Sequence, residues 1–240
     1  MTAHTGSMTP GLRVASYNIR KCVGLDRRRD PDRVLDVIAG LEADVVALQE
    51  ADRRLGGRPA TLDRWRIAEL TGLEAVDVAE NDVSLGWHGN AFLLGPDIEI
   101  EGIERLTLPG LEPRGAVLLQ ARRGDSSFRI VAAHLGLTRE FRRRQLRAIV
   151  RSAHRAGPDL PTMVLGDFNE WRMDRGLEPL GKHFTIHAPG LSFHAARPVA
   201  ALDRIALNDA VELRDAGVVQ TEVSRIASDH LPIWADLRLG

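Results

Sequence analysis

Apolar runs that end in a polar, ligand-type side chain recur along this sequence, and they restrict the possible folds more than any other feature. Residues 162–165 form such a run and lead into Gly166, Asp167 and Asn169. Three further runs end in the same manner, in Asn18, Glu50 and His134. A buried strand that reaches solvent at a carboxylate or an amide is a usual place for the chemistry of an α/β protein. A lone Gly-Asp-Phe-Asn segment is equally compatible with a tight turn, so it is the repetition that predicts a functional edge.

Two amphipathic helices are predicted between these runs. Asp30 is suited to cap a helix that starts at Pro31, and apolar residues at positions 34, 37, 38 and 41 give it one buried face. Thr138 can cap a second helix, whose apolar positions are Leu146, Ile149, Val150 and Ala153. Its arginines at 142, 143, 144 and 147 are expected mainly on the other faces. They form a solvated face, or one or two of them reach toward an anionic substrate near His134.

Strands and helices alternate along the chain, and no linker divides it. Predicted strands cover residues 12–17, 45–49, 90–94, 116–121, 129–133, 162–165, 202–207 and 233–237. The chain has 240 residues, of which 44% are hydrophobic and 27% charged, which suits one large core. We expect a mobile tail over residues 1–10 and a single domain over 11–240 that is a monomer. The pattern alone also permits an ordinary doubly wound sheet.

Six short motifs, in order along the chain, resemble those of the endonuclease/exonuclease/phosphatase superfamily. They are Ser-Tyr-Asn-Ile-Arg, Leu-Gln-Glu, His-Leu-Gly, Gly-Asp-Phe-Asn, Leu-Asp-Arg-Ile and Ser-Asp-His, and the resemblance runs from about residue 12 to 237. It implies an α/β (α+β) fold like that of deoxyribonuclease I, a four-layer sandwich of two packed mixed β-sheets flanked by helices. The site is then expected at one edge of the sandwich, and the chain is expected to be a phosphoester hydrolase.

Hydrolysis of a phosphoester requires neutralisation of negative charge and an oriented water molecule. Glu50 is the best candidate metal ligand, with Asn18 beside it, and Asp229 is expected to reach toward the same ion. This all-oxygen set suits Mg²⁺, with Mn²⁺ as a possible substitute. The alternative for Glu50 is an exposed cap.

The resemblance implies catalytic roles for five further residues. Asp167 would orient or deprotonate the attacking water, and Asn169 would donate a hydrogen bond to developing negative charge. His230 would contact the phosphate while Asp203 holds its far ring nitrogen. His134 is a candidate acid for the leaving oxygen, and a core histidine bonded to backbone is the alternative.

Substrate contacts are predicted at three more positions. Arg114 precedes a strand and could clamp a phosphate oxygen. His88 and Asn90 also resemble a family segment near the substrate, although a structural role for His88 is equally compatible with the sequence.

Departures from the family pattern reduce the range of candidate substrates. Arg20 stands where abasic-site endonucleases carry an aspartate, and Tyr17, the one tyrosine, is next to a strand end. Aromatic residues make up 5% of the chain and its formal net charge is −1, so there is no stacking platform or general attraction to a polyanion. A magnesium-dependent enzyme acting on a small-molecule or phospholipid-type phosphoester is favoured. A nuclease acting on DNA or RNA is the alternative, which a basic stripe over residues 142–151 beside the site would support, and an inactive binding module is the third possibility.

Compartment follows from two absences in the sequence. The single cysteine, Cys22, excludes an intramolecular disulfide, and no apolar stretch is long enough for a signal peptide or a membrane span. We expect a cytoplasmic protein without integral membrane association.

Overall fold

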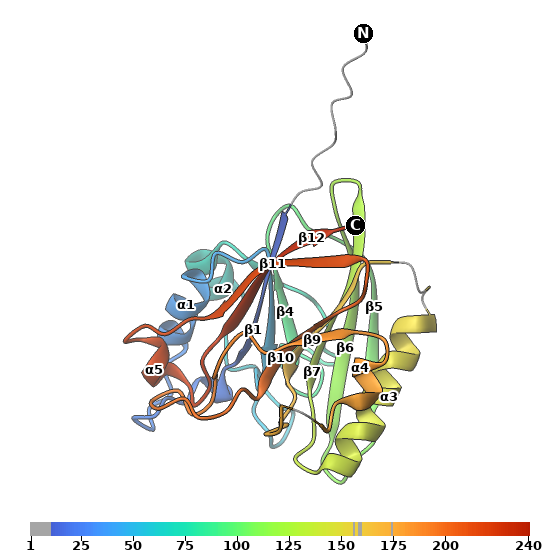
Figure 1. The fold of residues 1–240 in the computed structure, drawn as a ribbon. Helices are drawn as coiled ribbons and strands as arrows, with labels where there is room; N and C mark the ends of the chain where they lie inside the picture. Colours follow the sequence, from blue (N-terminus) through green and yellow to red (C-terminus); the bar gives the residue numbers. More distant parts are fainter. Residues whose placement is uncertain (1–10, 156, 158–159, 174) are drawn as a thin grey trace.

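Two mixed six-stranded sheets pack face to face in the computed structural model, which describes residues 11–155, 157, 160–173 and 175–240 (Figure 1). The expected tail over residues 1–10 lies outside the described residues. The first sheet, in spatial order, consists of β11 (Val211–Val218), β12 (Ile233–Leu239), β1 (Gly11–Asn18), β2 (Val45–Gln49), β4 (Ala91–Leu94) and β3 (Glu74–Ala75). The second consists of β5 (Glu99–Leu108), β6 (Arg114–Arg123), β7 (Ser126–His134), β8 (Thr162–Asp167), β10 (Asp203–Leu207) and β9 (Thr185–His187).

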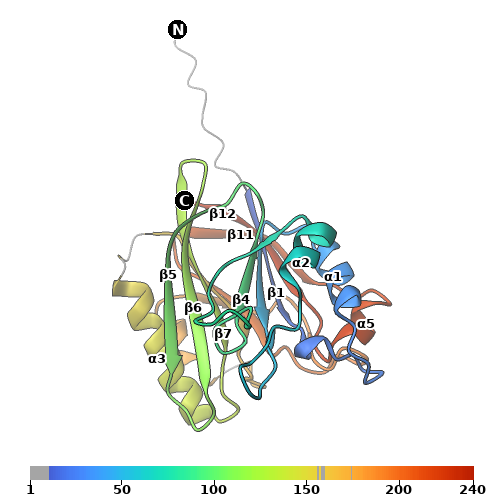
Figure 2. The ribbon, with the colours of Figure 1, turned by 180° about the vertical axis from the view of Figure 1, so that it is seen from behind.

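Helices cover the outer face of each sheet, as the two opposite views show (Figures 1 and 2). The first sheet carries α1 (Pro31–Ala39), α2 (Arg64–Thr71) and α5 (Ser224–Ala227), and the second carries α3 (Arg139–Arg155) and α4 (Glu178–Gly181). A short 3₁₀ turn, Arg20–Cys22, follows β1. The four-layer, deoxyribonuclease I-like sandwich expected from the motifs is therefore confirmed.

Alternation of side chains along the central strands explains the layers. In β1, Leu12 and Val14 belong to the apolar core between the two sheets, whereas Ala15 and Tyr17 pack in the core beneath α1. Successive side chains of a strand point to opposite faces, so a continuous apolar run is buried on both. The equivalent core beneath α3 holds Val131 of β7 and Leu146 of the helix.

The first predicted helix is confirmed in detail. The Asp30 side chain accepts a hydrogen bond from the Arg33 backbone N–H at 3.1 Å, and Pro31 occupies the first helical position. All four predicted apolar positions, Val34, Val37, Ile38 and Leu41, are buried. Within the described residues, no helix combines the length and apolar character needed to cross a membrane.

Four strands were not predicted, namely β3, β5, β9 and β11. Of these, β5 is an edge strand with a register shift between Ile100 and Gly102, and six of its ten residues are exposed. Its Ile100 and Ile103 side chains are partly in solvent, so no clean apolar alternation marks it. The helix α2 was also missed, because Ile67 is its one fully buried residue.

Candidate active site

The polar residues singled out in the sequence lie along one edge of the sandwich. Parallel pairing of β1 with β2 and of β7 with β8 brings Asn18, Glu50, His134 and Asp167 to the carboxyl ends of neighbouring strands. The antiparallel strand β10 begins at the same edge, because its first residue, Asp203, is paired with Asp167 of β8. Both sheets therefore supply side chains to one site.

Gly166 explains why the motif needs a glycine before its aspartate. Its φ of +145° is one that residues with a side chain rarely adopt, and a Cβ there would overlap the carbonyl oxygen of Ala133 on β7. The close approach of the two strands sets His134 beside Asp167.

Asn169 lies just beyond the end of β8, where its φ is +51°. Its backbone N–H donates to Asp167 Oδ1 at 2.9 Å, and its side-chain amide donates to the Leu135 carbonyl at 3.0 Å. The loop after β8 is thereby joined to the loop after β7.

A buried histidine and two polar partners form the most constrained part of the site. The His230 ring donates from Nδ1 to Asp203 Oδ2 at 2.8 Å, and the Ser192 hydroxyl donates to the same oxygen at 2.6 Å. Burial alone would lower the pKa of His230, but the negative charges of Asp203 and Asp167 and the hydrogen bond to Asp203 together raise it to about 9. The contact between Asp203 and the far ring nitrogen is the one the sequence predicted. Ser192 was not predicted, because it lies in a loop with no pattern that connects it to Asp203.

Asp203→Asn is expected to lower the pKa of His230 from about 9, because the substitution removes the nearest negative charge. The measurement is the pH titration of the His230 ring signals by nuclear magnetic resonance. Ser192→Ala, which keeps the charge, should lower this pKa less. An unchanged titration in Asp203→Asn would show that Asp203 does not hold the ring in solution.

The same shift predicts how stability depends on pH. The folded pKa of His230 is above the ordinary value of about 6.5, so its ion pairing stabilises the fold fully below that value. The stabilisation is lost as the pH rises through about 9. Melting temperatures of the parent should thus fall over this range more than those of Asp203→Asn.

Asp167 is the centre of the buried cluster. Its Oδ2 accepts a hydrogen bond from the Asn18 side-chain amide at 3.0 Å and lies 3.4 Å from His134 Nε2 and 3.6 Å from His230 Nε2. Burial raises the pKa of Asp167 to about 6, against the opposing charge of His230. Burial and the charge of Arg114 hold the pKa of His134 well below its usual range. At neutral pH Asp167 is therefore ionised, His134 is neutral and His230 is protonated.

The two remaining carboxylates predicted as metal ligands face positive side chains. Glu50 pairs with Lys21 and lies 3.9 Å from Arg54, while Asp229 lies 3.3 Å from Arg20 Nε. Glu50 is held at a φ of +54°, and Lys21 donates its backbone N–H to the Glu50 carbonyl at 3.0 Å. The Glu50 side chain is 17% exposed and does not fit the alternative of an exposed cap.

Arg114 and His88 line a cavity of about 260 Å³ that also borders Glu50 and His134. Arg114 is 8% exposed, and its Nη2 donates to Glu112 at 2.9 Å. The third residue predicted to contact substrate, Asn90, is fully buried and does not line this cavity. Its amide donates to the Gly115 and Trp87 carbonyls, which joins β4 to the other sheet.

Arg142 lies in the interior, and the expectation that it belongs to an outer face of the second helix was wrong. It is 4% exposed, and it donates to Glu170 Oε2 at 2.6 Å and to the Leu137 carbonyl at 2.7 Å. Arg143 and Arg144 do lie at the surface, where they pair with Glu178 and Glu140. The basic residues over 142–151 therefore do not form one solvated surface, because Arg142 is buried.

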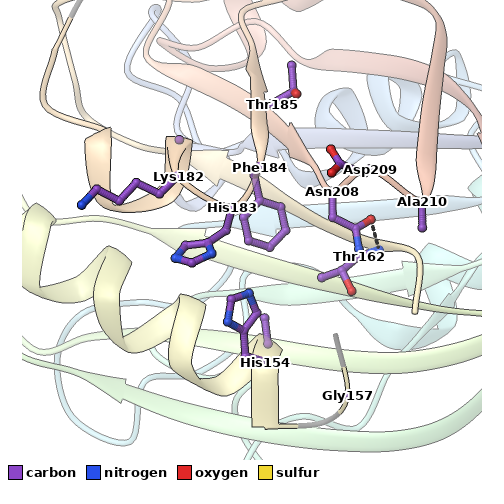
Figure 3. Close-up of a pocket in the computed structure, with 12 residues that line it drawn as sticks. His154, Gly157, Thr162, Lys182, His183, Phe184, Thr185, Asn208, Asp209 and Ala210 are labelled. Atoms are coloured by element: carbon purple, nitrogen blue, oxygen red, sulfur yellow. Dashed lines mark hydrogen bonds between the residues drawn. The ribbon is translucent and has the colours of Figure 1, made fainter. Parts of the chain in front are cut away.

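A larger cavity, of about 680 Å³, lies at the other end of β8 and β10 (Figure 3). Its labelled residues include Thr162, His154, His183 and Asn208. The rings of His154 and His183 approach each other edge to face at 4.6 Å between centroids. None of the residues predicted for the site lines it, so the chemistry described above is elsewhere.

Comparison with known proteins agrees with this arrangement. The sequence profile described as the Endonuclease/Exonuclease/phosphatase family matches residues 15–230. A relative of 26% identity, the uncharacterized protein YbhP of Escherichia coli K12, aligns over 95% of this chain and 96% of its own length.

Solved structures share the fold at lower identity. The endonuclease/exonuclease/phosphatase protein of Beutenbergia cavernae has a TM-score of 0.73 and 24% identity over 96% of this chain and 72% of its own. The mannosyl-6-phosphatase of Bacteroides thetaiotaomicron has a TM-score of 0.73 and 18% identity over 94% of this chain and 99% of its own.

Proposed function

Because the chain belongs to the Endonuclease/Exonuclease/phosphatase family, we propose that it hydrolyses a phosphoester of a small-molecule or phospholipid-type substrate with the help of a divalent metal ion. The observation that carries the proposal is the buried group of Asp167, Asp203 and His230, in which two carboxylates surround one protonated histidine. The mannosyl-6-phosphatase of Bacteroides thetaiotaomicron, whose name describes a small phosphoester substrate, has a similar fold and supports the proposal.

Asp167 is the proposed base. With a pKa raised to about 6, chiefly by burial, it is ionised at neutral pH yet basic enough to accept a proton from water. The Asn169 backbone N–H and the Asn18 amide fix its two oxygen atoms, so the carboxylate keeps one orientation.

His230 is proposed to stabilise negative charge on the phosphate. The pairing with Asp203 keeps its ring protonated and orients Nε2 toward the same space as Asp167 Oδ2. His134 is held neutral, so its contribution is a hydrogen bond from the ring rather than the proton of an imidazolium. Arg114 adds a second positive group on that side.

Two groups of side chains near the site are candidates for holding a divalent ion. Asp167, Asp203 and His230 lie close enough together to hold an ion, and Asp203 Oδ1 is buried without a hydrogen-bond partner among the described residues. The His230 ring, however, is protonated and donates to Asp203, so it offers no lone pair to a metal.

Glu50 is a mostly buried carboxylate whose charge is balanced by Lys21 and Arg54, and a bound ion would take the place of the Lys21 ammonium. We assign the ion to Glu50 with Asn18 and Asp229, an all-oxygen set that suits Mg²⁺ and accepts Mn²⁺. A bound ion supplies Lewis-acid stabilisation of phosphoryl charge.

The direct test is hydrolysis of bis-p-nitrophenyl phosphate and of p-nitrophenyl phosphate by the purified chain, with Mg²⁺, with Mn²⁺ and with a chelator. We expect hydrolysis that depends on the metal. Supercoiled plasmid DNA serves as a third substrate. No hydrolysis of either ester with either ion would contradict the proposal, and efficient plasmid nicking at low enzyme concentration would favour a nuclease.

Glu50→Gln is expected to raise the Mg²⁺ concentration for half-maximal activity by at least ~10-fold, because even indirect partners of a metal site contribute that much to affinity. Calorimetric titration of each protein with Mn²⁺ in the absence of substrate gives an independent measure of binding. Glu69→Gln, on an exposed face of α2, is the matched control and should match the parent. Unchanged Mn²⁺ affinity in Glu50→Gln would remove Glu50 from the metal site.

A further inference from the structure

Three loops enclose the cavity of about 260 Å³ that borders His134 and Glu50. They are the loop after β2, the loop before β4 and the loop before β6. Asp167, Asp203 and His230 are absent from its lining, so it lies to one side of the group proposed to act on the scissile phosphate. A volume below the ~300 Å³ of pockets that enclose a whole ligand suits one chemical group of a larger substrate.

Positive charge predominates in this cavity. Four arginines line it, at 53, 54, 58 and 114, together with three acids, Glu50, Asp52 and Glu112. All three acids are engaged with the protein. Asp52 accepts the backbone N–H groups of Leu85 and Gly86, Glu112 pairs with Arg114, and Glu50 pairs with Lys21.

The arginines, in contrast, retain unused donors. Among the residues that the structure describes, no carboxylate forms an ion pair with Arg53 or Arg58. Arg114 Nε is buried without a hydrogen-bond partner in the same part of the chain. Arg58 Nη1 lies 2.8 Å from His88 Nδ1, so that nitrogen accepts and the proton of the neutral ring is on Nε2. Within the described residues, the arginines of the cavity thus keep donors beyond those bonded to His88 and Glu112.

We propose that this cavity binds a second phosphate group of the substrate, next to the phosphate that is hydrolysed. Arginine forks suit the several oxygens of a phosphate better than a single point charge does, and a group bound there would lie against His134. The inference rests on the proposed function and narrows it, because it selects phosphoesters that carry two neighbouring phosphates. Arg53, Arg54 and Arg58 were not singled out in the sequence, although these three arginines lie within six residues that begin three positions after Glu50.

The test compares methylenediphosphonate, which carries two linked phosphonates and resists hydrolysis, with methylphosphonate, which carries one. Calorimetry at a fixed excess of free Mg²⁺ measures both affinities for the parent chain and for the double variant Arg53→Gln, Arg58→Gln. We expect the diphosphonate to bind the parent more tightly, and the double variant to lose at least ~10-fold of that affinity, as when charged hydrogen bonds are removed. Methylphosphonate binding should change little.

A control and a second probe complete the experiment. Arg147→Gln with Arg151→Gln, on the exposed side of α3, should leave both affinities unchanged. Equal affinity of the parent for the two phosphonates, or equal losses of both in the double variant, would overturn the inference. A single-stranded thymidine tetranucleotide that loses affinity in the double variant while the diphosphonate does not would assign the cavity to a nucleic-acid backbone phosphate instead.

Failure of the inference is distinguishable from failure of the proposed function. Binding of the phosphonates needs no turnover, whereas hydrolysis of bis-p-nitrophenyl phosphate needs no second phosphate. Hydrolysis without a diphosphonate preference would leave the proposed function in place and overturn the second-phosphate cavity alone.

Discussion

Asp167→Asn is expected to lower the turnover of bis-p-nitrophenyl phosphate by at least ~10²-fold, the lower end of the loss when a positioned acid–base group is removed. The amide keeps the shape of the carboxylate and can still occupy the space between Asn18 and His134. It cannot accept a proton from water at neutral pH, and it removes one of the charges that keep His230 protonated. The measurement is kcat and KM at saturating Mg²⁺, with a thermal melt to show that the variant is folded.

His230→Ala should cause a loss of similar size, and the double variant should be far less impaired than the product of the two losses. Groups that act on one transition state are strongly non-additive. Asp209→Asn, an exposed aspartate beside the cavity at the opposite end of β10, is the matched control with parental activity. Multiplicative losses in the double variant would mean that Asp167 and His230 serve different steps.

Arg142→Met should destabilise the fold by ~3–5 kcal/mol, because it removes the hydrogen-bonded partner of the buried Glu170 carboxylate and leaves it the more distant Arg139, at 3.8 Å. Glu170 is 2% exposed, and the pair is closed at 2.6 Å. Arg142 also holds the Gly136 and Leu137 carbonyls, so its loss frees the loop that follows His134. Chemical denaturation measures the free energy of unfolding, and a fall in melting temperature of roughly 6–20 °C should accompany it for a chain of this size.

Arg143→Met is the matched control on the adjacent residue of α3. Its pair with Glu178 is at the surface, where such pairs contribute at most ~1 kcal/mol. The double variant Arg142→Met, Glu170→Leu should recover part of the lost stability, since it removes the poorly paired charge. If Arg142→Met unfolded at the same denaturant concentration as Arg143→Met, the buried pair would not exist in solution.

Short sequence patterns predicted the elements whose structure depends only on neighbouring residues in the chain. Asp30 and Pro31 predicted the start of α1 because a cap and a first-turn proline act within one helical turn. The strand ends that carry Asn18, His134 and Asp167 were visible because a strand buried on both faces is a continuous apolar run. That two sheets pack against each other was predicted only from the family resemblance of the six motifs.

Contacts between distant segments were not predictable in the same manner. The helical pattern placed Arg142 away from the apolar face, yet Glu170 makes its burial favourable, and the two residues are far apart in sequence. Ser192 reaches Asp203 from a loop without regular structure. The edge strand β5 lost its alternation at the register shift after Ile100. In each case the partner that decides the outcome lies outside the window in which a sequence pattern is read.

The hydrogen bond from the Asn18 amide to Asp167 spans the seam between the two sheets, since one residue ends β1 and the other ends β8. Local opening of either sheet would break it, and a ligand held by residues of both sheets would have to be released first. Bound ligand should therefore slow amide hydrogen exchange in the central strands of both sheets, including amides far from any contact with it. Amide exchange rates measured with phosphonate bound would then show how strongly the two sheets are held together.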